Sequence, residues 1–295
     1  MTADVKKITI FWGHVASNLG DLAINAGQSQ LLSQAYPNAK LNVVFFGGNK
    51  NYINQSIKSF GPALASSFVF LKSSSKAIKF ILDPISFLSH CGALNSDLIV
   101  LAAGEFYFSY KKNLNTENLF WRTIPIIAAR DAKIPNIILP STYGPLETDF
   151  SIKLMKEVLR GSSNIATRES ESQRFLESLG FEITANTYLD PAFFIDTSLL
   201  LGPECPTEPP HIAVSVRTEF TGIRLSQSQR HSTSVKNSIS YRYVFGVLNE
   251  ILTRNKKKLI KIYVQTIADE KLATQLAEDL TKSFPNATIY TYRPT

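Results

Sequence analysis

The sequence predicts an α/β protein made of two units, each built on a parallel β-sheet. Short apolar runs, rich in β-branched and aromatic residues, alternate with helical segments along most of the chain, as is typical of parallel strands covered by helices. The segment 196–210 breaks this alternation with four prolines and one glycine, which predicts a linker. Because 295 residues are enough for two domains of ordinary size, we expect a first domain over 1–195 and a second over 211–295.

In the first domain, strands and helices are expected to follow one another regularly. Strands are predicted at 7–12, 41–47, 97–102, 136–139 and 164–167. Helices are predicted at 21–36, 75–89, 118–133 and 147–160, and a further helix ends at 179, before Gly180. Asp21 would cap the first helix, Pro84 would interrupt the second, and Pro125 would kink the third.

The second domain is predicted to be thin. Strands are expected at 212–216, 259–265 and 288–292, with helices at 241–254 and 269–283 between them. Three strands make a small sheet, so we expect an incomplete α/β unit.

Composition favours a soluble cytoplasmic protein that binds anions. No apolar run reaches the ~18 residues of a membrane span, and the N-terminus lacks the apolar region of a secretory signal. The net charge of +7 suits an anionic ligand or an anionic membrane face. The sequence contains no basic stripe with interleaved aromatics, so it does not indicate nucleic-acid binding. Cys91 and Cys205 lie far apart and predict neither a zinc site nor a disulfide framework.

Polar and charged residues directly follow the predicted strands. The carboxyl ends of parallel strands share one edge of a sheet, where α/β proteins bind their ligands. We therefore expect one cleft between the domains that contains Asn18, Asp21, Gly104, Glu105, Thr142 and Arg217. The segment Asn18-Leu19-Gly20-Asp21 is not a dinucleotide fingerprint, but a glycine turn before a helix leaves backbone N–H groups free for an anion.

Five motifs in order resemble those of the polysaccharide pyruvyl transferase family. They are Asn18-Leu19-Gly20-Asp21, Ala103-Gly104-Glu105, Pro140-Ser141-Thr142-Tyr143-Gly144-Pro145, Arg168-Glu169-Ser170-Glu171-Ser172 and Asp190-Pro191-Ala192-Phe193. The strand that ends at Arg217 is similar to the one that opens the family's second domain. The resemblance implies two Rossmann-like domains in a GT-B-like arrangement, and a transferase that moves pyruvate from phosphoenolpyruvate onto sugar hydroxyls of a bacterial surface polysaccharide or exopolysaccharide.

The implied reaction needs an anion site and groups that move protons, but no cofactor and no metal. Arg217 is the expected anion contact, and Asp21 and Glu105 are the expected catalytic carboxylates. The remaining expected substrate-binding residues are His14, Asn18, Gly20, Gly104, Thr142, Tyr143 and Arg168. The expected partners are phosphoenolpyruvate and a glycan or lipid-linked sugar, with a peripheral contact to the inner membrane face.

Each of these residues also has a purely structural interpretation. Asp21 could cap a helix, and Glu105 could be a solvated carboxylate. Arg168 could pair with Glu169 or Asp190 to hold the strand ends together, and Asp190 before Pro191 could form a turn. Arg217 could form a surface ion pair.

The chain also departs from the family pattern. Ser141, Thr142 and Tyr143 replace Gln, Ser and Ile, Ala103 replaces a glycine, and the family's later Arg-Leu-His segment has no counterpart. These departures predict a truncated chain or an inactive branch. They leave two alternatives open: a GT-B glycosyltransferase that uses a nucleotide sugar, and an inactive carbohydrate-binding remnant.

Overall fold

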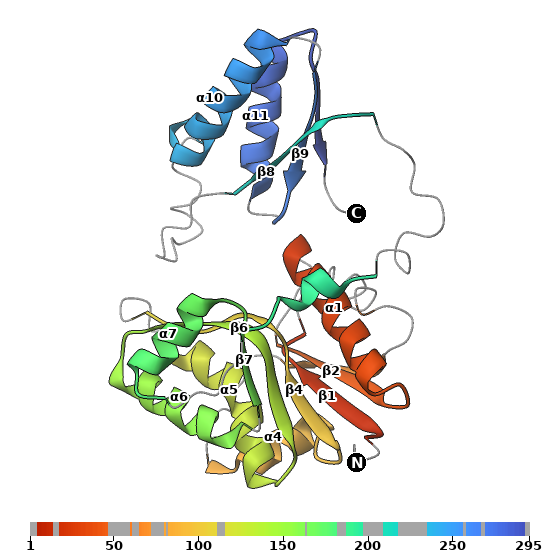
Figure 1. Cartoon of the computed structure of the whole chain (residues 1–295), viewed down its shortest axis with the longest axis vertical. Coiled ribbons are helices and arrows are strands. Elements are labelled where there is room, and N and C mark those ends of the chain that lie inside the picture. Colours follow the sequence, from red (N-terminus) through yellow and green to blue (C-terminus); the bar gives the residue numbers. More distant parts are fainter. Residues whose placement is uncertain are drawn as a thin grey trace. The chain divides into compact units, whose positions relative to one another are not determined.

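The structure is a computed structural model of the chain. It describes residues 5–13, 18–46, 60, 65–71, 80, 82–110, 116–162, 164–181, 187–196, 209–217, 235–255, 258–266 and 269–292. The chain divides into two compact units. The first comprises Met1–Ala16 and Gly20–Leu200, and the second comprises Ser17–Leu19 and Leu201–Thr295. Each unit combines a parallel sheet with helices (Figure 1).

The first unit contains a seven-stranded parallel sheet. β1 (Lys7–Phe11) pairs with β2 (Lys40–Phe46) on one side and with β4 (Leu98–Leu101) on the other. β3 (Ala65–Leu71) extends the sheet beyond β2. The strand order therefore reverses direction at β1, which places a topological switch point between β1 and β4.

The other half of the sheet is organised around one long strand. β6 (Asn136–Leu146) pairs first with β4 and then with β5 (Gly104–Ser109) along one side. β7 (Asn164–Thr167) pairs with the opposite side of β6. β4 and β5 thus act as one strand that is interrupted before Gly104.

Helices cover both faces of this sheet, as expected for a doubly wound fold (Figure 1). The helices are α1 (Leu19–Ala35), α4 (Pro84–His90), α5 (Thr116–Asp131), α6 (Asp149–Gly161) and α7 (Ser170–Ser178). Phe11 of β1 packs in a core cluster with Phe87 of α4, whereas its neighbour Ile10 packs in a second cluster with Leu32 of α1. Successive side chains of a strand point to opposite faces, so β1 supplies both cores.

Two predicted loops are in fact strands. Gly104 and Glu105 belong to β5, and β6 continues through Thr142 to Leu146, although glycine and proline were expected to end both strands. The pairing of β6 with β7 shifts register between Ile138 and Ser141. Pro140, which has no N–H to donate, lies in this irregular interval, so the strand tolerates it.

The predicted N-cap of the first helix is wrong, and β3 was not predicted. α1 begins at Leu19, so Asp21 lies in its first turn and is not the N-cap. The interruption expected at Pro84 is confirmed, since Phe80 and Leu82 are helical, Asp83 is not, and α4 begins at Pro84. Asp83 is the N-cap of α4 and accepts a hydrogen bond from the Ser86 N–H at 3.2 Å. Residues 75–79 and 81 of this predicted segment lie outside the described residues. A proline fits a first turn because the N–H that it lacks would have had no partner within the helix. Pro125 lies inside α5 as expected.

The second unit contains a three-stranded parallel sheet in the order β10–β9–β8. Its elements are β8 (Ile212–Val216), the 3₁₀ turn η3 (Val235–Asn237), α10 (Ile239–Arg254), β9 (Leu259–Val264), α11 (Glu270–Ser283) and β10 (Thr288–Tyr292). These strands and helices agree with the predicted ones to within two residues. Leu248 of α10, Ile262 of β9 and Leu276 of α11 are central to its core. That this unit is incomplete stays a prediction.

None of the helices in the described ranges combines the length and the apolar character needed to cross a membrane. The predicted linker lies mostly outside those ranges, since only 196, 209 and 210 of it are described.

Candidate functional site

Three predicted site residues of the first unit lie on neighbouring strands. Glu105 is the second residue of β5, Thr142 lies inside β6, and Arg168 follows the end of β7. Glu105 of β5 is the direct pairing partner of Thr142 of β6, and Gly104 is the partner of Ser141. Ser141 also pairs with Thr167, the last residue of β7, which Arg168 follows. Strand pairing therefore brings Glu105, Thr142 and Arg168 close together. The prediction that Glu105 and Thr142 follow strand ends is wrong, because β5 and β6 run through them. That these residues form a substrate site stays a prediction.

Arg168 is the centre of a polar network beside these strands. Its Nε donates to Thr142 Oγ1 at 2.6 Å, and its Nη1 donates to Asp190 Oδ2 at 3.0 Å. Nε also lies 3.3 Å from Glu169 Oε2. These contacts confirm the interpretation that Arg168 holds the strand ends together through both carboxylates. Its Nη2 has no hydrogen-bond partner among the described residues, so the guanidinium keeps donors for a ligand.

Glu169 extends the network to α7. Its Oε2 accepts a hydrogen bond from the Thr142 hydroxyl at 3.1 Å, and its Oε1 accepts one from the Ser172 hydroxyl. The Ser172 oxygen in turn accepts the backbone N–H of Tyr143 at 2.8 Å. A guanidinium, two hydroxyls and a carboxylate thus bind one another in sequence and fix the second half of β6.

Asp190 connects this network to a short turn that packs on α1. It is the N-cap of the 3₁₀ turn η2 (Pro191–Phe194), and its Oδ1 accepts the Ala192 N–H at 2.9 Å. The prediction that Asp190 forms a turn is therefore confirmed. A methyl group at Gly27 of α1 would lie 1.8 Å from the Pro191 carbonyl oxygen, so this close approach requires glycine.

Sequence reasoning missed two buried amides beside the switch point. Asn25 and Gln28 of α1 are both fully buried. The Gln28 Oε1 accepts the backbone N–H of Ala103 at 3.3 Å, and its Nε2 donates to Asn25 Oδ1 at 3.4 Å. The amides thus bind α1 to the interruption between β4 and β5. The available signal was the polar character of residues 25, 28 and 29 on the buried face of the helix.

Tyr143 is placed differently from the other predicted site residues. Its ring is 3% exposed and stacks on Tyr107, with ring centroids 4.8 Å apart. Neither hydroxyl has a hydrogen-bond partner in the described part of the chain. Burial raises the pKa of both tyrosines well above that of a free phenol. The ring belongs to the core, whereas its role in substrate binding stays a prediction.

The remaining predicted site residues are divided between the two units. Asp21 is half-buried and Gly20 is exposed in the first turn of α1. Asn18 belongs to the second unit, as does Arg217, which follows β8 and is exposed. His14 lies outside the described residues. That the predicted site residues of the first unit and those of the second meet in one cleft between the domains stays a prediction.

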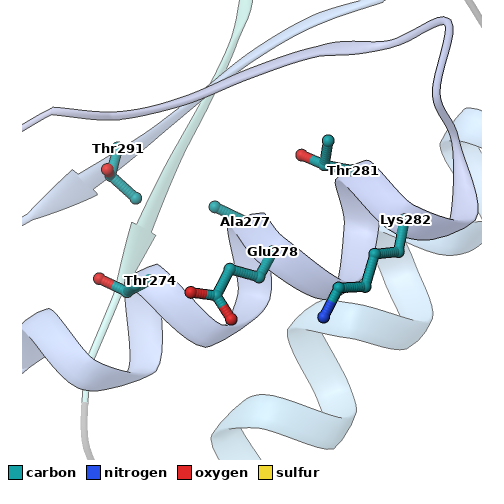
Figure 2. Close-up of a pocket in the computed structure, with 6 residues that line it drawn as sticks. All are labelled: Thr274, Ala277, Glu278, Thr281, Lys282 and Thr291. Atoms are coloured by element: carbon teal, nitrogen blue, oxygen red, sulfur yellow. The ribbon is translucent and has the colours of Figure 1, made fainter.

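The second unit also contains an open cavity of about 430 Å³ between α11 and β10. Figure 2 shows its lining side chains, which are Thr274, Ala277, Glu278, Thr281 and Lys282 of α11 and Thr291 of β10. None of these residues follows the carboxyl end of a strand within the sheet, and none was predicted for the site. The cavity is therefore not the candidate site.

The described side chains favour neither a metal site nor a reactive thiol. Within the described ranges, no group of three or more His, Cys, Asp or Glu residues could hold a metal ion. Burial raises the pKa of the Cys91 thiol to about 12, so it stays protonated at neutral pH and is a poor nucleophile.

Comparison with solved structures shows the fold. The chain is similar to UDP-GlcNAc 2-epimerase from Neisseria meningitidis bound to UDP-GlcNAc, with 12% identity, a TM-score of 0.55, and coverage of 98% of this chain and 72% of that one. It is also similar to S. aureus MnaA with UDP, with 9% identity, a TM-score of 0.53, and coverage of 97% and 69%. The predicted GT-B fold with two Rossmann-like units is therefore confirmed.

Comparison at the level of sequence shows the family. No curated protein sequence matches the chain. The family model of the polysaccharide pyruvyl transferases matches residues 18–292, which span all five motifs. The chain therefore belongs to the polysaccharide pyruvyl transferase family.

Proposed function

We propose that this protein transfers the pyruvyl group of phosphoenolpyruvate to two hydroxyls of one sugar in a surface polysaccharide or exopolysaccharide, or in its lipid-linked precursor. Protonation of the methylene carbon makes C2 cationic. The two hydroxyl oxygens then form bonds to C2, and the C2–O bond to phosphate breaks. One hydroxyl proton replaces the proton used at the methylene carbon, and the other leaves with phosphate. The products are a cyclic ketal and inorganic phosphate.

One observation carries this proposal. The chain is a family member in which Glu105 and Thr142 pair on neighbouring strands of one sheet and Arg168 Nε donates to Thr142 Oγ1. A carboxylate and a guanidinium close together suit a reaction that moves protons beside a multiply charged anion. Neither a metal nor a cofactor enters this scheme.

The proposed roles follow from the chemistry of each group. Arg217 would bind the phosphate or carboxylate of the donor, because its guanidinium is exposed and has no ion-pair partner among the described residues. Asp21 and Glu105 would exchange protons with the acceptor hydroxyls. Substrate contacts would come from the other predicted residues, namely His14, Asn18, Gly20, Gly104, Thr142, Tyr143 and Arg168. We place the reaction in the cytoplasm, where phosphoenolpyruvate is available, with a peripheral contact to the inner membrane face.

Binding and turnover together test the proposal. Phosphoenolpyruvate binding would be measured by calorimetry, and phosphate release would be measured with a panel of acceptor glycans. Arg217→Met should weaken binding about 10- to 100-fold, as expected for a lost charge-assisted contact of roughly 1.5–3 kcal/mol. Arg254→Met is the matched control, since Arg254 is exposed on α10 and pairs with Glu250.

The alternative is a glycosyltransferase that uses a nucleotide sugar. Tight binding of a nucleotide sugar, with no binding of phosphoenolpyruvate, would favour that alternative. Unchanged donor affinity in Arg217→Met would remove Arg217 from the site while leaving the family reaction open.

A further inference from the structure

Helix α10 has two apolar faces. Tyr241, Leu248 and Leu252 point into the core of the second unit and are at most 7% exposed. On another face, Ile239, Tyr243 and Val247 are 67%, 72% and 42% exposed. These three residues are spaced by four, so they form one stripe along two turns. A surface helix needs only one apolar face to pack on its sheet. The described part of this unit therefore does not explain the exposed stripe.

One basic residue borders the stripe, and a second lies beyond the far end of α10. Arg242 is exposed beside Ile239 and Tyr243, and its guanidinium has no partner in the described part of the chain. The next acidic residue on this face, Glu250, is paired with Arg254. Lys258 is exposed just after the helix, at the end of a run of three lysines in the sequence. Among the described residues, the unpaired charges on and just after α10 are therefore basic, on a chain whose net charge is +7.

We infer that this face of α10 binds the surface of an anionic lipid bilayer. Ile239, Tyr243 and Val247 would enter the interface between headgroups and acyl chains, while Arg242 and Lys258 would contact lipid phosphates. An apolar stripe bordered by Lys and Arg is the pattern of helices that lie in a membrane interface, and a tyrosine is suited to that depth because its ring is apolar and its hydroxyl is polar.

The size of the stripe favours a membrane over a protein partner. A stable protein interface buries about 800 Å² on each side, and a stripe of three side chains on a single helix is much smaller than that. Anionic lipids add an attraction for each basic residue near the surface, so a short stripe with several cations can bind reversibly. This inference concerns where the protein acts, and it does not depend on the proposed reaction.

The test is co-sedimentation of the full chain with vesicles. One set would contain phosphatidylcholine only, and the other equal parts of phosphatidylcholine and phosphatidylglycerol. We expect binding to the anionic vesicles only, and weaker binding at high salt. The triple variant Ile239→Ser/Tyr243→Ser/Val247→Ser should lose about tenfold or more in partitioning, and Arg242→Glu should lose several-fold.

A matched control removes exposed aromatics elsewhere in the same unit. Tyr290 and Tyr292 of β10 are 57% and 52% exposed, and Tyr290→Ser/Tyr292→Ser should bind anionic vesicles like the parent protein. Circular dichroism and the thermal midpoint would show that all variants are folded.

Three results would overturn the inference. These are a parent protein that does not bind anionic vesicles, a triple variant that binds them as well as the parent does, and equal binding to neutral vesicles. A triple variant that loses an oligomeric state, but not vesicle binding, would show that the stripe covers a second copy of the chain.

Discussion

Arg168 and Arg217 both follow a parallel strand, but their surroundings differ. Arg168 contacts Thr142, Glu169 and Asp190, and its side chain is 25% exposed. Arg217 follows β8, is exposed, and has no ion-pair partner among the described residues. The positive charge of Arg168 is largely neutralised by its own unit, whereas no residue in the described ranges forms an ion pair with Arg217.

This difference separates two roles that look alike in the sequence. A motif position after a strand predicts that a residue lies at the carboxyl edge, and not whether its charge serves the fold or a ligand. The partners decide that, because an arginine held by two carboxylates stabilises the edge, while an exposed one remains available to an anion.

The largest effect on stability is expected where the backbone of α1 packs on the backbone of the turn η2, next to Asp190. Gly27→Ala would place a methyl group against the Pro191 carbonyl oxygen, so α1 or the turn η2 must move. We expect a loss of about 3 kcal/mol in the free energy of unfolding, measured with urea. Gly246→Ala on α10 is the control, since nothing lies within 4 Å of the new methyl group, and it should gain about 0.5–1 kcal/mol. Similar results for both variants would show that the Asp190 turn is not seated on α1.

Replacing the two arginines tests the comparison directly. Arg168→Met leaves Asp190 and Glu169 without their cation, while their side chains are only 16% and 31% exposed. We expect a loss of about 2 kcal/mol in the free energy of unfolding, since a partly buried carboxylate is costly without its partner. Arg217→Met should change it by less than about 0.5 kcal/mol. An Arg168→Met protein as stable as its parent would mean that the network contributes nothing to the edge.

The sequence predicted part of this arrangement, but not how it is held together. Strand periodicity and the five motifs predicted Glu105, Thr142 and Arg168 after neighbouring parallel strands. The structure has them on neighbouring strands, but Glu105 and Thr142 lie within β5 and β6. The hydrogen bonds of Ser172, Gln28 and Asn25 were not predictable, since each depends on contacts between segments far apart in the chain. Pro140 and Gly104 misled for a related reason: their local preference for loops was overridden by pairing on both sides of β6.

Two buried tyrosines differ in the same way as the two arginines. One hydroxyl has a hydrogen-bond partner and the other has none among the described residues, so the effect of a partner can be measured on neutral side chains. The Tyr143 hydroxyl is buried with no partner in the described ranges, whereas the Tyr241 hydroxyl donates to Asp279 Oδ2 at 2.6 Å. Tyr143→Phe removes an unsatisfied polar group and should raise the free energy of unfolding by about 1 kcal/mol, while Tyr241→Phe should lower it by about 1 kcal/mol. A destabilised Tyr143→Phe protein would indicate that this hydroxyl has a partner after all.

The smallest effect is expected at Asp279. This carboxylate accepts hydrogen bonds from a cation and from a neutral donor in the second unit, as Asp190 does in the first. Hydrogen bonds from Lys236 and then from Tyr241 lower the pKa of Asp279 below its usual range. A carboxyl whose pKa is lower in the folded state adds stability above its unfolded pKa of about 3.9, and that stability is lost as the pH falls through the folded value.

Asp279→Asn should therefore be less stable than the parent at pH 7, by about 0.5 kcal/mol because Lys236 is half exposed to solvent. The difference should shrink as the pH falls below about 3.9, because the unfolded parent takes up a proton at Asp279 before the folded parent does. Urea unfolding at a series of pH values measures it, and a difference that stays constant from pH 7 to pH 3 would show that the charge of Asp279 does not stabilise the second unit.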